Sequence, residues 1–76
     1  MPQAYVCINT YTGYEAEVLK KLKKVKEIEE AFLVYGVYDL IVKIKADSME
    51  ELRDNITLGL RKNKKIKSTL TMIIIE

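Results

Sequence analysis

Residues 31–45 read AFLVYGVYDLIVKIK, in which two apolar runs flank the short segment GVYD at residues 36–39. Runs of Ala, Leu, Val, Ile and aromatic residues are typical of β-strands, so residues 31–35 and 40–45 are predicted to be strands. Four residues are too few for the crossover that a parallel pair of strands needs. The stretch therefore predicts an antiparallel hairpin.

A strand and a helix are predicted before the hairpin. Residues 4–8 are strand formers, and the polar residues that follow them supply a turn. Thr12 is followed three residues later by Glu15, which is the spacing of a capping box at the start of a helix. The apolar residues that follow recur at three- and four-residue steps, as one face of a helix requires: Val18, Leu19, Leu22 and Val25.

A second helix and a last strand are predicted after the hairpin. Asp47 and Ser48 are each followed three residues later by a glutamate, which gives two overlapping capping boxes. Gly59 lies near the end of this helix, where a missing side chain would let the helix approach the sheet closely. Residues 66–75 are predicted to form the last strand, since they end in a run of apolar strand formers.

The predicted elements follow the order β-α-β-β-α-β over a chain of 76 residues, which is the length of one domain. This order is that of the ferredoxin-like fold, an α+β fold in which both helices cover one face of a four-stranded antiparallel sheet. Residues 1–76 are therefore predicted to be a single domain with one covered and one uncovered sheet face.

The uncovered face of this sheet is predicted to be apolar. Alternation along the strands directs Tyr5, Cys7, Ile41 and Ile73 away from the helices. Soluble monomers rarely expose a continuous apolar area of several hundred Å². The chain is therefore expected to dimerise through this face.

Composition argues against several functional classes. The 13 Lys and Arg against 11 Asp and Glu give a net charge of +2, which is too balanced to demand a nucleic-acid or membrane partner. With no histidine and one cysteine, the sequence predicts neither a metal site nor a cofactor, and it offers few groups for acid–base catalysis. No enzyme is predicted, and the lack of a long apolar segment favours a cytoplasmic location.

Two short motifs carry a family resemblance. Residues 35–40 read YGVYDL, a Gly-x-Tyr-Asp-hydrophobic pattern, and residues 68–74 read STLTMII, a Thr-x-Thr pattern followed by apolar residues. With this order of elements, the chain resembles the ligand-binding RAM domain, named for the regulation of amino-acid metabolism, of the Lrp/AsnC transcriptional regulators.

The resemblance implies a binding and assembly function. Domains of this family pair sheet to sheet as dimers, the dimers form rings of eight or ten chains, and amino-acid effectors sit at contacts between dimers. The family's ligand-binding positions correspond here to the following residues: Gly36, Tyr38, Asp39, Thr69 and Thr71. An amino acid is a zwitterion, so the Asp39 carboxylate would suit its ammonium, and threonine hydroxyls or backbone N–H groups would suit its carboxylate.

The resemblance also implies partners. Full-length members of the family carry a helix-turn-helix that contacts DNA, and 76 residues leave no room for one. A stand-alone domain would not bind DNA sequence-specifically by itself. It would be expected to modulate transcription through ligand-dependent assembly or by co-assembly with full-length regulators of the family.

Other interpretations of the same residues remain open at this point. Gly36 and Asp39 are also ordinary turn residues, and threonine is also a good strand former. Gly13, between the first predicted strand and helix, leaves an ACT-like regulatory subunit as an alternative. An RNA-binding module of the same topology would need aromatic residues on its central strands, and residues 40–45 contain none.

Overall fold

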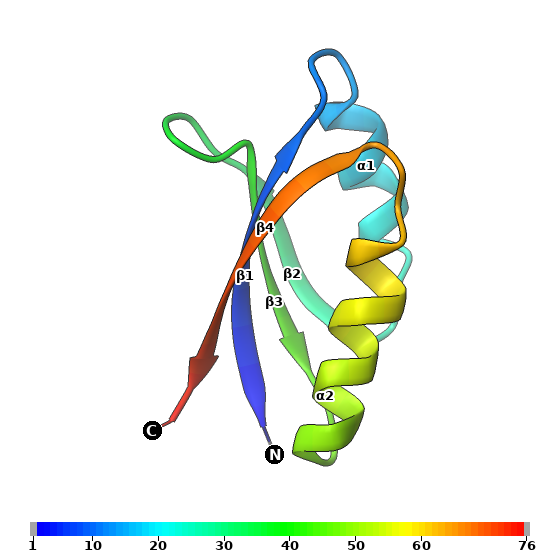
Figure 1. The fold of residues 1–76 in the computed structure, drawn as a ribbon, viewed down its shortest axis with the longest axis vertical. Coiled ribbons are helices and arrows are strands. Elements are labelled where there is room, and N and C mark those ends of the chain that lie inside the picture. The colour runs from blue at the N-terminus through cyan, green and yellow to red at the C-terminus, as the bar shows by residue number, and fades with distance from the viewer. Residues whose placement is uncertain (1, 76) are drawn as a thin grey trace.

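The computed structural model describes residues 2–75, and in this part of the chain four strands and two helices form two layers (Figure 1). The strands are β1 (Gln3–Thr10), β2 (Ile28–Leu33), β3 (Leu40–Lys45) and β4 (Ile66–Ile74). The helices are α1 (Glu15–Leu22) and α2 (Met49–Ile56), and α2 continues as a π-helical segment, Thr57–Arg61. The order confirms the predicted βαββαβ fold.

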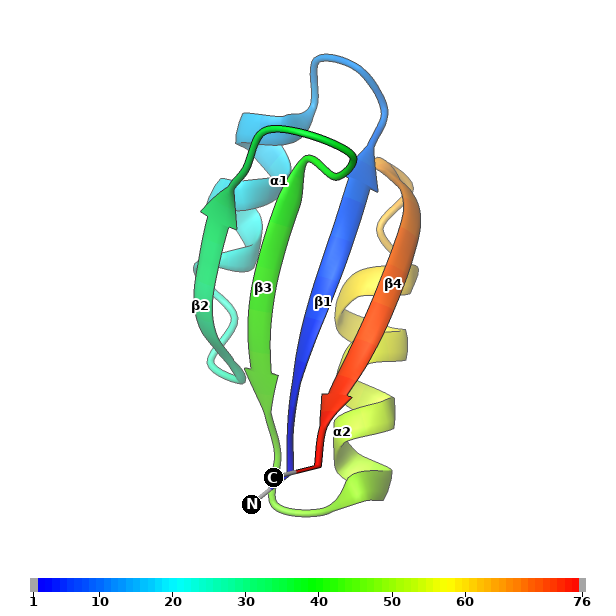
Figure 2. The same cartoon turned by 90° about the vertical axis from the view of Figure 1, so that its left-hand side faces the viewer.

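The four strands form one antiparallel sheet in the order β2-β3-β1-β4. Figure 1 shows both helices on the same side of this sheet, and Figure 2 shows the opposite side with no helix in front of it. The predicted arrangement, with both helices on one face, is therefore confirmed. We call the two sides of the sheet the covered face and the open face.

The core lies between the covered face and the helices. Burial alternates along β1 and β3, so every second side chain points toward the helices. The strands and the helices contribute these fully or almost fully buried residues: Ala4, Val6, Ile8, Leu40, Val42, Ile44, Val18, Leu22, Leu52 and Leu60. Leu22 and Val18 lie one helical turn apart on α1, as the predicted apolar stripe requires.

Strand β2 differs from its prediction at both ends. It spans Ile28–Leu33 rather than residues 31–35, and the connection to β3 takes residues 34–39. The register changes between Ile28 and Glu30, so the strand contains an extra residue, as in a β-bulge. Because of this irregularity Ile28 and Ala31, an odd number of positions apart, both face the core.

Strand β4 begins at Ile66 as predicted and ends at Ile74, one residue before the predicted end. One of its side chains also points to the other side of the sheet than predicted. Ile73 pairs with Ala4, whose side chain is fully buried in the core. Since paired residues of antiparallel strands point to the same side, Ile73 belongs to the covered face, and its predicted place on the open face is wrong. Leu70 and Met72 pair with residues of the open face instead.

The two helices begin in different ways. Ser48 precedes α2, and its hydroxyl accepts a hydrogen bond from the Glu51 backbone N–H at 3.1 Å. This bond confirms Ser48 as the N-cap, which is one half of a predicted capping box. The capping box predicted for Thr12 does not form, because Tyr14 precedes α1 and makes no side-chain cap. Glu15 instead accepts a hydrogen bond from the backbone N–H of Gly13.

The end of α2 corrects a further prediction. A Cβ atom built on Gly59 would have no heavy atom within 4 Å, so this glycine faces open space. The predicted close approach of Gly59 to the sheet is therefore wrong. Within residues 2–75, no helix has both the length and the apolar character that crossing a membrane requires.

Candidate functional site

The connection between β2 and β3 borders an open hollow of about 530 Å³. Its lining comes from the end of β2, the connection itself and the start of α1: Glu15, Leu33, Val34, Tyr35, Gly36 and Asp39. In Figure 2 the connection and the start of α1 lie at the same end of the sheet. Gly36 and Asp39, predicted from the same motif, thus line the same hollow.

Asp39 is fixed by contacts with the end of β1. Its Oδ2 atom accepts a hydrogen bond from the Thr10 backbone N–H at 2.9 Å and lies 3.4 Å from the Thr10 hydroxyl, which donates a second bond. The backbone N–H of Asp39 donates to the carbonyl oxygen of Ile8 at 3.0 Å. Thr10 is 6% exposed, so the carboxylate satisfies polar groups at a buried strand end.

Gly36 has the backbone conformation that its residue type favours. Its φ of +137° is rarely adopted by residues with a side chain, so the glycine is needed for the path of the connection. No heavy atom lies within 4 Å of the place where a Cβ would stand. The neighbouring side chains of Tyr35 and Val37 are almost fully exposed, so Gly36 leaves the hollow open to solvent.

Glu15 is a member of this lining that the motif did not predict. Its Oε1 atom accepts the Gly13 N–H at 2.9 Å, which holds the first residue of α1 next to the β1–α1 loop. The spacing of Glu15 from Thr12 predicts helix capping, and the sequence gives no direct signal that Glu15 lines a ligand-binding site. Glu15 and Asp39 bring two carboxylates to the lining, which contains no lysine or arginine. The hollow therefore favours a positively charged group.

The other predicted ligand-binding residues lie outside this hollow in a single chain. Tyr38 is half-buried in the connection but is not part of the lining. Thr69 and Thr71 pair with Ile8 and Val6 of β1, on the strand at the edge opposite β2. Two strands therefore separate the threonines from β2, and the structure does not bring them together with Gly36.

The open face forms a second surface of interest. Its apolar members come from all four strands: Tyr5, Cys7, Phe32, Ile41, Leu70 and Met72. Phe32, Leu70 and Met72 keep 52%, 47% and 45% of their surface exposed, although no helix lies on this side. The predicted apolar open face is thus present, with Leu70 and Met72 in place of Ile73.

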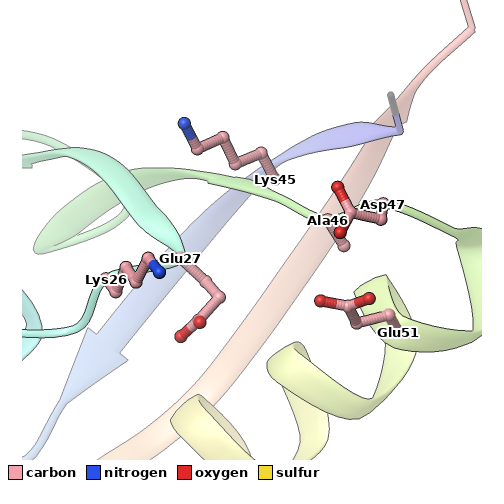
Figure 3. Close-up of a pocket in the computed structure, with 6 residues that line it drawn as sticks. All are labelled: Lys26, Glu27, Lys45, Ala46, Asp47 and Glu51. Atoms are coloured by element: carbon pink, nitrogen blue, oxygen red, sulfur yellow. The ribbon is translucent and has the colours of Figure 1, made fainter.

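A smaller hollow of about 160 Å³ lies at the opposite end of the sheet (Figure 3). The Glu27 carboxylate lies on one side of it, those of Asp47 and Glu51 lie on the other, and the Lys45 ammonium points away from all three. Within residues 2–75, no group of His, Cys, Asp or Glu side chains is arranged to hold a metal ion. This hollow therefore gives no support for a metal site.

Comparison with known families identifies the class of protein. The family model described as the Lrp/AsnC ligand binding domain matches residues 3–76. The chain belongs to this family, which confirms the resemblance drawn from the hairpin and the Thr-x-Thr motif. A search of curated proteins gave no match.

Solved structures of similar length have the same fold. The protein FFRP-DM1 is 44% identical, with a TM-score of 0.96, and the match covers 99% of this chain and all of that one. A hypothetical protein from Pyrococcus horikoshii is 43% identical, with a TM-score of 0.94, and the match covers this whole chain and 92% of that one. The two similarities extend the family assignment over the whole fold.

A longer regulator contains the same fold as part of its chain. The structure of a transcriptional regulator from Neisseria meningitidis in complex with L-methionine matches with a TM-score of 0.81 at 14% identity. The match covers 99% of this chain and 50% of that regulator. At this identity the comparison shows a common fold alone.

Proposed function

We propose that this chain is a regulatory module that binds an amino acid beside the β2–β3 connection and changes its assembly state when the ligand binds. The observation that carries the proposal is the hollow in which Gly36 and Asp39 meet Glu15, in a chain of a ligand-binding family. The L-methionine complex of the Neisseria regulator, which has the same fold, supports an amino acid as the ligand class.

The charges of the hollow explain how one end of the ligand is held. An amino-acid ammonium pairs with the carboxylates of Asp39 and Glu15, and hydrogen bonds between charged groups are among the strongest that a protein makes. Open space beside Gly36 admits the ligand close to the backbone. The apolar side chains of Leu33 and Val34 form the wall against which a ligand side chain packs.

The ligand carboxylate needs donors that this hollow supplies poorly. Its lining has no lysine or arginine, and the predicted Thr69 and Thr71 lie on the far edge strand. We therefore place those donors on a second protomer, so that the complete site exists at a contact between chains. Such a ligand stabilises the assembled state because it binds that state better than the separate chains.

Self-association begins with the open face. Stacking two open faces would remove Phe32, Leu70 and Met72 from water, and apolar burial of this kind contributes roughly 25 cal/mol per Å². Further contacts at the hairpin edges would join dimers into rings, with an octamer or decamer as the expected size. The same surfaces would allow co-assembly with full-length Lrp/AsnC regulators, which is how the chain would modulate transcription.

Light scattering on a size-exclusion column, with and without each of the twenty amino acids, tests the proposal. We expect a dimer or larger assembly whose mass changes with one amino acid or a few related ones. An assembly that ignores all twenty would contradict ligand control while leaving the open-face dimer intact. A chain that stays monomeric at micromolar concentration would contradict the dimer as well.

Substitution of Asp39 tests the site itself. Asp39→Asn retains an acceptor for the Thr10 N–H but removes the negative charge, so the hairpin should stay anchored while the ammonium loses its partner. We expect calorimetry to show at least about tenfold weaker binding of the active amino acid, since a hydrogen bond to a charged group contributes roughly 1.5–3 kcal/mol. Glu30→Gln, an exposed β2 carboxylate outside the lining, is the matched control.

If Asp39→Asn binds the amino acid with unchanged affinity, Asp39 has a purely structural role at the end of β1. Equal weakening in Glu30→Gln would mean that net charge, and not this hollow, governs binding. Asp39→Ala is a less useful variant, because it would also leave the buried N–H and hydroxyl of Thr10 without their acceptor.

A further inference from the structure

Positive charge gathers at the junction of the π-helical segment, β4 and α1. Five of the positions from 61 to 67 are basic, and Lys21 of α1 lines the same hollow as three of them. We define the basic stripe as Lys21, Arg61, Lys62, Lys64, Lys65 and Lys67. The chain as a whole carries a net charge of +2, so the rest of the molecule is net negative and the charge is unevenly distributed.

The stripe crosses two neighbouring hollows. The first, of about 280 Å³, lies between α1 and the connection to β4, and Lys21, Lys62, Lys64 and Lys65 line it. The second, of about 390 Å³, lies beside the start of β4, where Arg61 and Lys67 are joined by Ser68 and Thr69. The segment 61–69 contributes to both hollows, so the positive charge continues from one to the other.

Most of this charge is not neutralised within the chain. Lys65 pairs with Glu17 and lies 4.9 Å from the centroid of the Tyr14 ring. The hydrogen bond from Lys65 to Glu17 raises the pKa of Lys65 above its ordinary value of 10.5, so the amine stays charged. Among residues 2–75 the other five members of the stripe make no ion pair. The stripe is therefore available to an external anion.

We infer that the basic stripe is a sequence-independent contact surface for the phosphate backbone of double-stranded DNA. Exposed lysines act as point charges that neutralise phosphates without reading base edges. An extended polyanion fits better than a single small anion, because the charge runs across two hollows.

A duplex fits the stripe better than a single strand. Proteins that hold single-stranded nucleic acid usually stack its bases on aromatic rings, and no aromatic residue lines either hollow. The nearby ring of Tyr14 is already in contact with the Lys65 ammonium.

The salt dependence of DNA binding tests the inference. Fluorescence anisotropy of two unrelated labelled duplexes would be measured between about 50 and 200 mM salt, the range over which phosphate contacts are strongly weakened. We expect equal affinity for both sequences and a linear fall of log K with log salt. Absence of binding at the lowest salt, or a strong preference for one sequence, would overturn the inference.

A triple variant locates the DNA-binding surface. Lys21→Gln, Lys62→Gln and Lys64→Gln remove three unpaired charges but leave Lys65 and its interactions in place. We expect binding at low salt to weaken at least about tenfold, with the slope of log K against log salt reduced by about 0.9 for each phosphate that is no longer neutralised. Circular dichroism would verify that the fold is retained.

A second triple variant with the same charge change serves as the control. Lys23→Gln, Lys26→Gln and Arg53→Gln lie outside both hollows. We expect this variant to bind the duplex nearly as well as the unmodified chain. Equal weakening in both variants would show that net charge governs binding and that no defined surface exists. Tighter binding of a single strand of the same length would show that the preferred ligand is single-stranded nucleic acid and not a duplex. Either result would overturn the inference.

Discussion

The covered and open faces of the sheet carry similar apolar side chains in different surroundings. Leu40 and Val42 on the covered face are fully buried, whereas Phe32 and Met72 on the open face keep about half of their surface exposed. Both faces carry Ile or Leu side chains, whereas the aromatic residues of the strands, Tyr5 and Phe32, lie on the open face. Alternation along a strand separates the two faces without showing which of them the helices cover. The faces differ because only one of them receives the helices, so the open face is where this fold has apolar area left for another chain.

The largest expected effect concerns the covered face. Leu40→Ala removes a fully buried side chain from between the sheet and the helices. We expect the free energy of unfolding to fall by about 2–5 kcal/mol, as for other buried leucines, in urea-denaturation curves measured on samples of equal concentration. A loss under about 1 kcal/mol would mean that the core collapses around the gap and that the covered face is packed no better than the open one.

The second prediction concerns the open face. Met72→Lys places a charge opposite Tyr5, where the proposed dimer would bury it, while a separate chain keeps the position about half exposed. We expect the dimer dissociation constant to rise at least about tenfold with little change in the circular dichroism spectrum. Sedimentation equilibrium would measure the constant.

A matched change on the other side of the molecule sharpens this test. Leu58 is 60% exposed and lies in the π-helical segment of the helix layer, so Leu58→Lys adds the same charge to an exposed apolar position. It should leave the dimer unchanged. If Leu58→Lys dissociates the dimer and Met72→Lys does not, self-association uses the helix layer and the open face has another role.

The smallest predicted effect concerns the helix that makes one face covered. Ser48→Ala removes the hydroxyl that caps the first turn of α2, and we expect a loss of about 1 kcal/mol of stability. Thr12→Ala should change stability by less than about 0.5 kcal/mol, because Thr12 makes no such cap for α1. Thermal unfolding of the two variants compares their stabilities directly. Similar losses of stability would contradict the conclusion that only α2 is capped by a side chain.

These differences show how far local sequence rules reach in this chain. The order of elements, the Ser48 cap and the apolar open face could be predicted, since each depends on short-range spacing or alternation. The limits of β2 could not, because the irregularity at Glu29 and Glu30 shifts the alternation in the strand. The side of Ile73 depends on pairing with a strand far away in the sequence, and spacing within β4 does not determine it.

The candidate site could also be predicted only in part from short-range sequence patterns. Gly36 and Asp39 belong to one short motif, and the fold keeps them together in one hollow. Glu15 joins them because the start of α1 lies at the same end of the sheet, which is a property of the topology. The threonines of the second motif lie across the sheet, so whether they reach a ligand depends on assembly between chains.

The hydrogen bonds between Asp39 and Thr10 have a consequence for binding energetics. Both go to the same oxygen, Oδ2, and the Oδ1 atom accepts no hydrogen bond from residues 2–75. Folding therefore immobilises this carboxylate before any ligand arrives. A ligand ammonium would meet a preorganised acceptor, and the conformational entropy of ordering that side chain would not be subtracted from its affinity.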